Sequence, residues 1–272
     1  MAHINFSSRA NSYEQNALVQ KAAAEVLLKL MSIQGDEEAL DLGCGSGSVS
    51  RKIALLTRGT VVGVDLSDGM ISEALRSNCN PPNVSFFEKD AEELKFTDKF
   101  DVIYCNSAFQ WFSNPRKVLE QCFKALKPGG RMGIQAPATV MYNPNFMAAV
   151  EKVRANPATS RIFSAFKSPL LFLDSTEEYS QLFENCGFFV AHCQFIKDSA
   201  RYSAEQVYSI YQSGAENGYL NQSFYTVPLT ETYIETFRQL VKEAFNEQSD
   251  QSGMVELEFT RVYLVAKKNS LV

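Results

Sequence analysis

The sequence has few of the residues that most often perform acid–base or metal chemistry. Of its 272 residues, two are histidine and one is tryptophan. Its six cysteines form no C-x-x-C pair and show no spacing typical of a metal site. We therefore expect no bound metal, and a reduced, cytoplasmic protein.

An excess of basic residues and long apolar runs are also absent. The formal net charge is −5, which does not favour a nucleic-acid partner, because neutralising phosphates requires a basic surface. No run approaches the roughly 18 apolar residues of a membrane-spanning helix. We expect a monomer with neither nucleic acid nor membrane among its partners.

The clearest positive signal lies between Glu38 and Asp65. A short apolar segment leads into three alternate glycines (Gly43, Gly45 and Gly47), then into an amphipathic stretch, and then into T-V-V-G-V-D. This order of strand, glycine turn, helix, strand and acid is typical of a βαβ nucleotide-binding unit. Glycine lets a ligand lie against bare backbone, and Asp65 at the end of the second strand can accept two hydrogen bonds from a ribose diol.

The details of the turn distinguish between cofactors. A dinucleotide fingerprint requires a small third residue, glycine or alanine, where this chain has Ser48. Asp41 would repel a pyrophosphate but suits an ammonium and a sulfonium. The segment D-L-G-C-G-S-G resembles motif I of the class I S-adenosylmethionine-dependent methyltransferases, which implies S-adenosyl-L-methionine as the cofactor.

The rest of the chain continues this pattern as far as residue 137. Strands are expected to end at Asp65, Asp90 and Asn106, and Asn114 with Pro115 predicts the start of a helix. We predict a doubly wound α/β fold with a seven-stranded, mostly parallel, Rossmann-like sheet and a helical cap. The expected parts are an N-terminal arm and cofactor-binding core (1–137), a cap segment (138–187), and the last two strands (188–272), which enclose a helical cap insertion at about 200–250.

Further motifs narrow the resemblance. K-D-A-E from Lys89 and N-S-A-F-Q-W from Asn106 follow the third and fourth strands. With the N-terminal arm and the C-terminal R-V-Y-L-V-A-K-K, they resemble the malonyl-carrier-protein O-methyltransferases of biotin synthesis and the trans-aconitate methyltransferases. The resemblance implies cofactor contacts from Tyr13, Asp41, Gly43, Cys44, Gly45, Asp65, Leu66, Met70, Asp90, Ala91, Asn106 and Ser107.

The same resemblance implies methylation of a carboxylate, either on a small organic acid or on its acyl-carrier-protein thioester. A carboxylate is ionised at neutral pH and needs no base, so we assign no catalytic residue and expect the protein to act by positioning. The expected substrate contacts are Gln110, Trp111, Tyr142 and Arg201, and Arg154 and Arg161 are further candidates for a carboxylate clamp. Alternatives are N- or C-methylation of a small molecule, a nicotinamide-dependent oxidoreductase, and a non-catalytic cofactor-binding protein.

Overall fold

A computed structural model describes residues 18–270 of the chain, with side chains described from residue 22 onward. The strands are β1 (Ala39–Leu42), β2 (Val61–Asp65), β3 (Val84–Glu88), β4 (Phe100–Asn106), β5 (Leu126–Pro137), β6 (Phe189–Ser203) and β7 (Met254–Lys267). The helices are α2 (Leu18–Met31), α3 (Ser48–Leu56), α4 (Asp68–Arg76), α5 (Pro115–Ala125), α6 (Pro144–Ala155), α7 (Ser160–Phe163), α8 (Thr176–Glu184), α9 (Ala204–Ser213), α10 (Glu216–Tyr219) and α11 (Glu231–Glu247). Short 3₁₀ turns are η2 (Ala91–Glu93), η3 (Phe109–Trp111) and η4 (Gln222–Phe224).

The strands form one seven-stranded sheet in the order β3-β2-β1-β4-β5-β7-β6. The first five strands are parallel, whereas β7 runs antiparallel to both β5 and β6. The predicted doubly wound, mostly parallel sheet is therefore confirmed. Within residues 18–270 no helix is both long enough and apolar enough to cross a bilayer.

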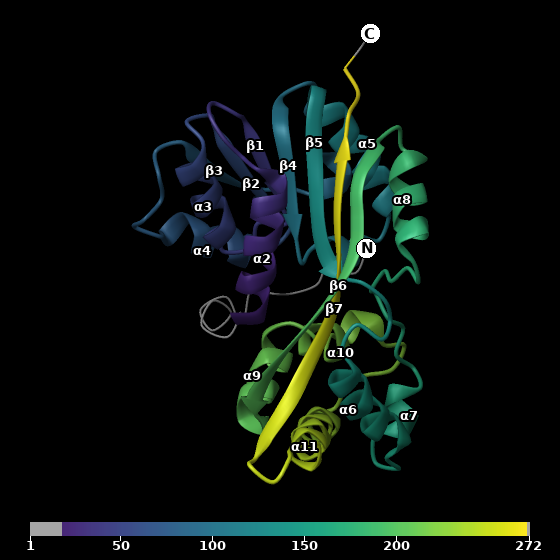
Figure 1. Cartoon of the computed structure of the whole chain (residues 1–272). Coiled ribbons are helices and arrows are strands. Elements are labelled where there is room, and N and C mark those ends of the chain that lie inside the picture. Colours follow the sequence, from purple (N-terminus) through teal and green to yellow (C-terminus); the bar gives the residue numbers. More distant parts are fainter. Residues whose placement is uncertain (1–17, 271–272) are drawn as a thin grey trace.

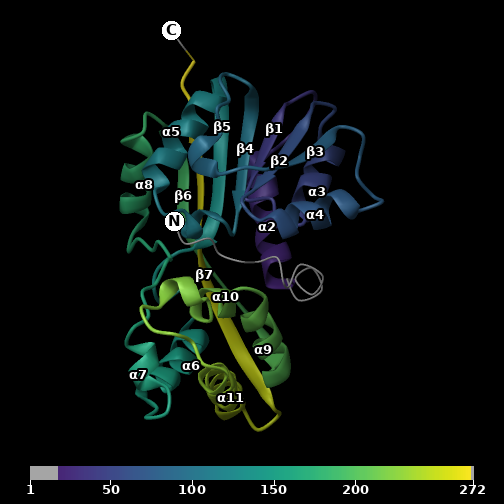
Figure 2. The ribbon, with the colours of Figure 1, turned by 180° about the vertical axis from the view of Figure 1, so that it is seen from behind.

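Helices cover both faces of the sheet. Leu40 and Leu42 of β1 lie in a core with α5 and α8, whereas Ala39 lies in a second core with α2 and α3. Every residue of β1 is buried, as expected for a central parallel strand between two helical layers. Figures 1 and 2 show these helices on opposite sides of the sheet.

The cap below the sheet has a hydrophobic core of its own. Aromatic side chains dominate this core, including Phe146 of α6, Tyr211 of α9 and Phe237 of α11. The β6–β7 hairpin joins the two parts. β7 pairs with β5 only from Arg261 onward but with β6 along its whole length, so the first half of β7 extends into the cap. Figure 1 shows that β7 spans both the cap and the sheet.

The structure corrects the sequence prediction for 138–187. That whole stretch was predicted to be a cap segment. Its first part contains α6, which begins at Pro144 with the Asn143 side chain as its cap, as Asn114 and Pro115 begin α5. Farther along, α8 packs Tyr179 and Phe183 into the sheet core. The cap part of this segment therefore ends before α8.

The N-cap of α6 provides a test of how the cap is stabilised. The buried Asn143 side chain accepts a hydrogen bond from the Phe146 backbone N–H at 2.7 Å. We expect Asn143→Ala to lower the free energy of unfolding by about 1 kcal/mol, because one helix donor loses its partner. Asn246→Ala, at an exposed position in α11, should leave it nearly unchanged. Urea denaturation measures both, and equal effects would contradict the capping role.

Candidate functional site

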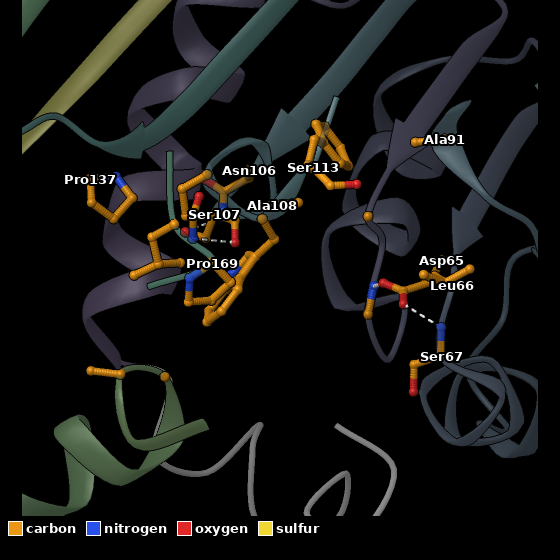
Figure 3. Close-up of a pocket in the computed structure, with 18 of the residues that line it drawn as sticks. Asp65, Leu66, Ser67, Ala91, Asn106, Ser107, Ala108, Ser113, Pro137 and Pro169 are labelled. Carbon is orange, nitrogen blue, oxygen red and sulfur yellow. Dashed lines mark hydrogen bonds between the residues drawn. The ribbon is translucent and has the colours of Figure 1, made fainter. Parts of the chain in front are cut away.

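The carboxyl ends of the parallel strands open onto a cavity of about 740 Å³ that continues into the cap. We call its two halves the cofactor end and the cap end. The cofactor end is lined by residues within 42–45, 64–70, 89–92 and 106–113, and the cap end by residues within 135–146, 167–170, 210–215, 223–226 and 259–261. Figure 3 shows Asp65 and Ser67 on one wall, facing Asn106, Ser107 and Pro137 across the space.

The glycine turn and Asp65 form one wall of the cofactor end. One carboxylate oxygen of Asp65 accepts a hydrogen bond from the Gly45 N–H, and the other accepts one from the Ser67 N–H, both at 2.9 Å. Gly45 adopts a φ of +55°, and a Cβ added there would meet no protein atom within 4 Å. The turn therefore presents bare backbone to open space, as a close-lying ligand requires.

Two of the predicted cofactor residues lie behind the turn rather than in the cavity. Cys44 is buried and packs its side chain against Phe86, Ile71 and Ala74. Asp41 is only 2% exposed, and it accepts a hydrogen bond from the Ser50 hydroxyl at 2.5 Å. Neither residue lines the cavity. Any contact of Cys44 with a ligand in the cavity would come from its backbone. Asp41 would act on such a ligand through its charge, from beneath the turn.

Burial raises the pKa of both acids near the turn. It raises the pKa of Asp41 to about 7, and the neighbouring Asp65 charge adds to this, against the Ser50 hydrogen bond. Burial also raises the pKa of Asp65, although backbone N–H groups of Ser67, Gly45 and Leu66 oppose the shift. A cationic ligand group near these carboxylates would favour their ionised forms.

A polar network lines the opposite wall. The Ser107 hydroxyl donates to Gln135 Oε1, and Gln110 Nε2 donates to the Ser107 carbonyl, both at 2.9 Å. Ser107 has a φ of +54°, a strained backbone for a residue with a side chain. Within the described part of the chain, Asn106 Oδ1 and Gln110 Oε1 are buried without a hydrogen-bond partner. Unmatched buried acceptors are costly, so these oxygens fit a ligand with donor groups.

Most of the other predicted contacts line the same cavity. Gly43, Leu66, Met70, Asp90 and Ala91 all lie at its cofactor end. Among the predicted substrate contacts, Gln110, Trp111 and Tyr142 line it as well. Tyr13 lies outside the described residues.

The structure does not bring Arg201 to the cavity. Arg201 lies in the part of β6 that extends into the cap, and its exposed side chain pairs with Asp250 in the loop before β7. Arg154 and Arg161 do not line the cavity either. Among the described residues, the arginine that lines it is Arg261 of β7, which sequence reasoning did not single out. Arg261 stands immediately before the apolar run V-Y-L-V-A, and this charge at the edge of a buried strand segment was the available signal.

Comparison with known proteins identifies the class of this core. Residues 40–134 match the family model described as a methyltransferase domain. This segment contains β1 to β4 and most of β5, together with the glycine turn and Asp65. The chain therefore contains a methyltransferase domain. The predicted resemblance to the class I methyltransferases is confirmed, with S-adenosyl-L-methionine as the cofactor of this domain.

Individual relatives agree with that class. The chain is 35% identical to a malonyl-[acyl-carrier protein] O-methyltransferase of Bacillus cereus over 130 residues, which are 46% of this chain and 48% of the relative. It is 32% identical to a trans-aconitate 2-methyltransferase of Deinococcus radiodurans over 129 residues, 47% of this chain and 48% of the relative. The chain thus spans about half the length of the curated relatives it matches.

A solved structure extends the similarity in fold beyond the matched segment. The phosphoethanolamine N-methyltransferase 2 of Haemonchus contortus, solved in complex with S-adenosyl-L-methionine, superposes with a TM-score of 0.59 at 16% identity. The superposition covers 97% of this chain and 57% of that one. At this identity, the likeness concerns the fold alone.

The residues of the cofactor end fit the cofactor of this class. The open space at Gly45 admits a ligand against the backbone, and the Asp65 carboxylate lies beside that space with lone pairs for a ribose diol. Asn106 Oδ1 and Gln110 Oε1 supply further acceptors. Among the described residues, no group of three or more His, Cys, Asp or Glu could hold a metal ion.

The raised pKa of Asp41 predicts a pH dependence of stability. An unfolded aspartate titrates near 3.9, roughly three units below the folded value of about 7. Between these values the folded protein keeps a proton that the unfolded chain has lost, so stability falls as pH rises, by up to about 1.4 kcal/mol per pH unit. Thermal unfolding of the ligand-free protein from pH 4.5 to 7.5 measures this slope.

Asp41→Asn provides the matched control. Its amide oxygen can still accept the Ser50 hydrogen bond, but the side chain no longer titrates. We expect a smaller loss of stability with rising pH in this variant. The pH dependence of stability that remains in this variant includes the titration of Asp65, whose pKa is also raised. Identical slopes in the two proteins would show that Asp41 does not titrate in this range.

Proposed function

We propose that the protein is an S-adenosylmethionine-dependent methyltransferase that methylates a carboxylate oxygen of a small organic acid or of its carrier-protein thioester. The observation that carries this proposal is the continuity of the cavity. The glycine turn and Asp65 of the methyltransferase domain line one end, and the cap encloses the other. A ligand at the cofactor end therefore faces a space for a second molecule.

The protein's contribution to this reaction is positioning. When bound, S-adenosyl-L-methionine supplies a methyl group on a sulfonium sulfur that is already activated for displacement. Asp65 and the turn would hold the nucleoside, and the cap would exclude water from the remaining space. Gln110 links the two parts, because its backbone carbonyl accepts a hydrogen bond from the Leu171 N–H at 2.9 Å.

The side chains in the cavity favour an acceptor that is already ionised. Burial raises the pKa of Tyr142 and of Tyr225, so both phenols are protonated at neutral pH and are poor bases. An amine or phenol acceptor needs help in losing a proton, whereas a carboxylate does not. Methylation of an ionised carboxylate would yield a neutral ester, so no side chain of the cavity would have to accept a proton.

The names of the relatives support the same chemistry. The Bacillus cereus relative is named for O-methylation of a malonyl-carrier protein, and the Deinococcus radiodurans relative for methylation of trans-aconitate. Both compounds carry free carboxylates. The family match ends at residue 134, before the cap, which supports a role for cap residues in the choice among acids.

Ligand binding and methyl transfer test this function directly. We expect calorimetry to show micromolar binding of S-adenosylhomocysteine and no binding of NAD. Incubation with a methyl-labelled donor and a panel of carboxylic acids should yield base-labile methyl esters. Binding of NAD alone would exclude the proposed class. Label found only on amines would exclude the carboxylate acceptor.

A pair of glycine variants tests where the cofactor lies. Gly45 and Gly35 both have positive φ, +55° and +63°, and a Cβ at either meets no protein atom within 4 Å. Alanine at each should cost about 1 kcal/mol of stability, because the left-handed backbone disfavours a side chain. Only Gly45→Ala should also weaken S-adenosylhomocysteine binding, by at least tenfold. Equal affinities of the two variants in calorimetry would place the ligand elsewhere.

A further inference from the structure

The charged side chains of the cavity are separated by sign. The cofactor end contains the acids Asp65, Asp90 and Glu92, with Lys89 as its basic residue. The cap end contains Lys167 and Arg261, and none of the described residues that line it is acidic. A cationic ligand therefore suits the first end and an anionic ligand the second.

Arg261 has an unusual environment for an arginine. Its side chain is only 6% exposed, and its guanidinium lies 4.4 Å from the centroid of the Phe259 ring, which also lines the cavity. One of its nitrogens, Nη1, donates to Asp198 on the neighbouring strand β6. Its other N–H groups have no hydrogen-bond partner within residues 18–270. A nearly buried guanidinium whose remaining N–H groups lack partners is suited to binding an anion.

The ion pair with Asp198 orients this guanidinium without neutralising it fully. The Asp198 side chain is 52% exposed, so water screens its charge. The ring of Phe259 and the Asp198 carboxylate together hold the guanidinium in one place. This leaves the remaining edge of the planar fork for a carboxylate, which it can bind through two parallel hydrogen bonds.

The strand register places Arg261 at the junction of the two ends of the cavity. It pairs with Pro137, the last residue of β5. Before Arg261, β7 lies in the cap and pairs with β6 alone; from Arg261 onward it also pairs with β5 in the sheet. Gln135, two residues before Pro137, is bonded to Ser107 on the cofactor side. A carboxylate held by Arg261 would thus lie between the cofactor end and the cap.

The remainder of the cap end is largely apolar. Its lining includes Tyr142, Phe146, Leu170, Ile210 and Phe224. The Tyr142 ring is stacked on Phe172, with the centroids 5.6 Å apart and the planes at 18°. A small, fully polar acid would leave this surface in contact with water, whereas a hydrocarbon body would bury it.

We propose that the methyl acceptor is a monocarboxylic acid with an apolar alkyl or aryl body, and that Arg261 binds its carboxylate. This inference rests on the proposed function and names the substrate class of the same site. Arg261 attracts the charged acid but has no such attraction for the neutral ester. The same residue therefore favours substrate entry and product release.

Binding of octanoate and of the neutral octanamide tests the inference. Both are titrated into protein saturated with S-adenosylhomocysteine, and calorimetry measures the affinities. Wild type should bind octanoate at least tenfold more tightly than octanamide. Arg261→Gln should abolish this preference while keeping its affinity for S-adenosylhomocysteine. Arg261→Lys keeps the charge but loses the fork, and should retain only part of the preference.

Arg201→Gln is the matched control. Arg201 belongs to the same hairpin and is also paired with an aspartate, but its side chain is exposed outside the cavity. This variant should bind octanoate as wild type does. Acetate, which lacks the apolar body, should bind wild type at least tenfold more weakly than octanoate.

Methyl transfer separates this inference from the proposed function. With octanoate as acceptor, Arg261→Gln should raise KM at least tenfold and change kcat less. A variant that binds and methylates octanoate as wild type does would overturn the role of Arg261, and so would a wild type without preference for octanoate over octanamide. In either case, methyl esters of other acids would leave the proposed function standing. Absence of S-adenosylhomocysteine binding would instead remove the proposed function itself.

Discussion

The structure of the site depends on the partly buried carboxylate of Asp65. Its two oxygens bind the backbone N–H groups of Gly45 and Ser67, and so join the turn after β1 to the start of α4. The Gly43 and Cys44 N–H groups both donate to the carbonyl of Val64, the residue before Asp65 in β2. These two hydrogen bonds also attach the turn to β2. The glycine turn is thus held open by the next strand, and not by its own sequence alone.

The same arrangement places two acids close together, Asp41 buried and Asp65 partly buried. Asp41 lies beneath the turn and Asp65 beside it, and burial raises the pKa of each. Such a pair is unfavourable in the empty protein, because burial and mutual repulsion both oppose ionisation. A ligand that carries positive charge relieves this cost. The site thereby favours a cationic ligand before any specific hydrogen bond is considered.

The cap is attached to this domain through the β6–β7 hairpin. β5 ends at Pro137, but β6 and β7 continue as a two-stranded ribbon onto which the cap helices pack. Further contacts, such as the Leu171 N–H donating to the Gln110 carbonyl, connect the cap directly to the cofactor end. Residues that the chain separates widely therefore line one continuous cavity. The proposed role of Arg261 follows from its place where the ribbon leaves the sheet.

The sequence by itself determined the elements whose signals are local. The glycine turn, Asp65 and the capped start of α5 at Asn114 are each specified by a few adjacent residues, and all are found as predicted. The same pair of residue types at Asn143 and Pro144 begins α6. Only the tertiary structure decided which cap residues reach the cavity. Arg201 and Arg261 belong to one hairpin, but strand register places Arg261 beside Pro137, whereas Arg201 lies farther along the ribbon and pairs with Asp250 at the surface. Side-chain periodicity is a local property that a sequence displays, whereas the pairing of distant strands depends on the packing of the whole chain.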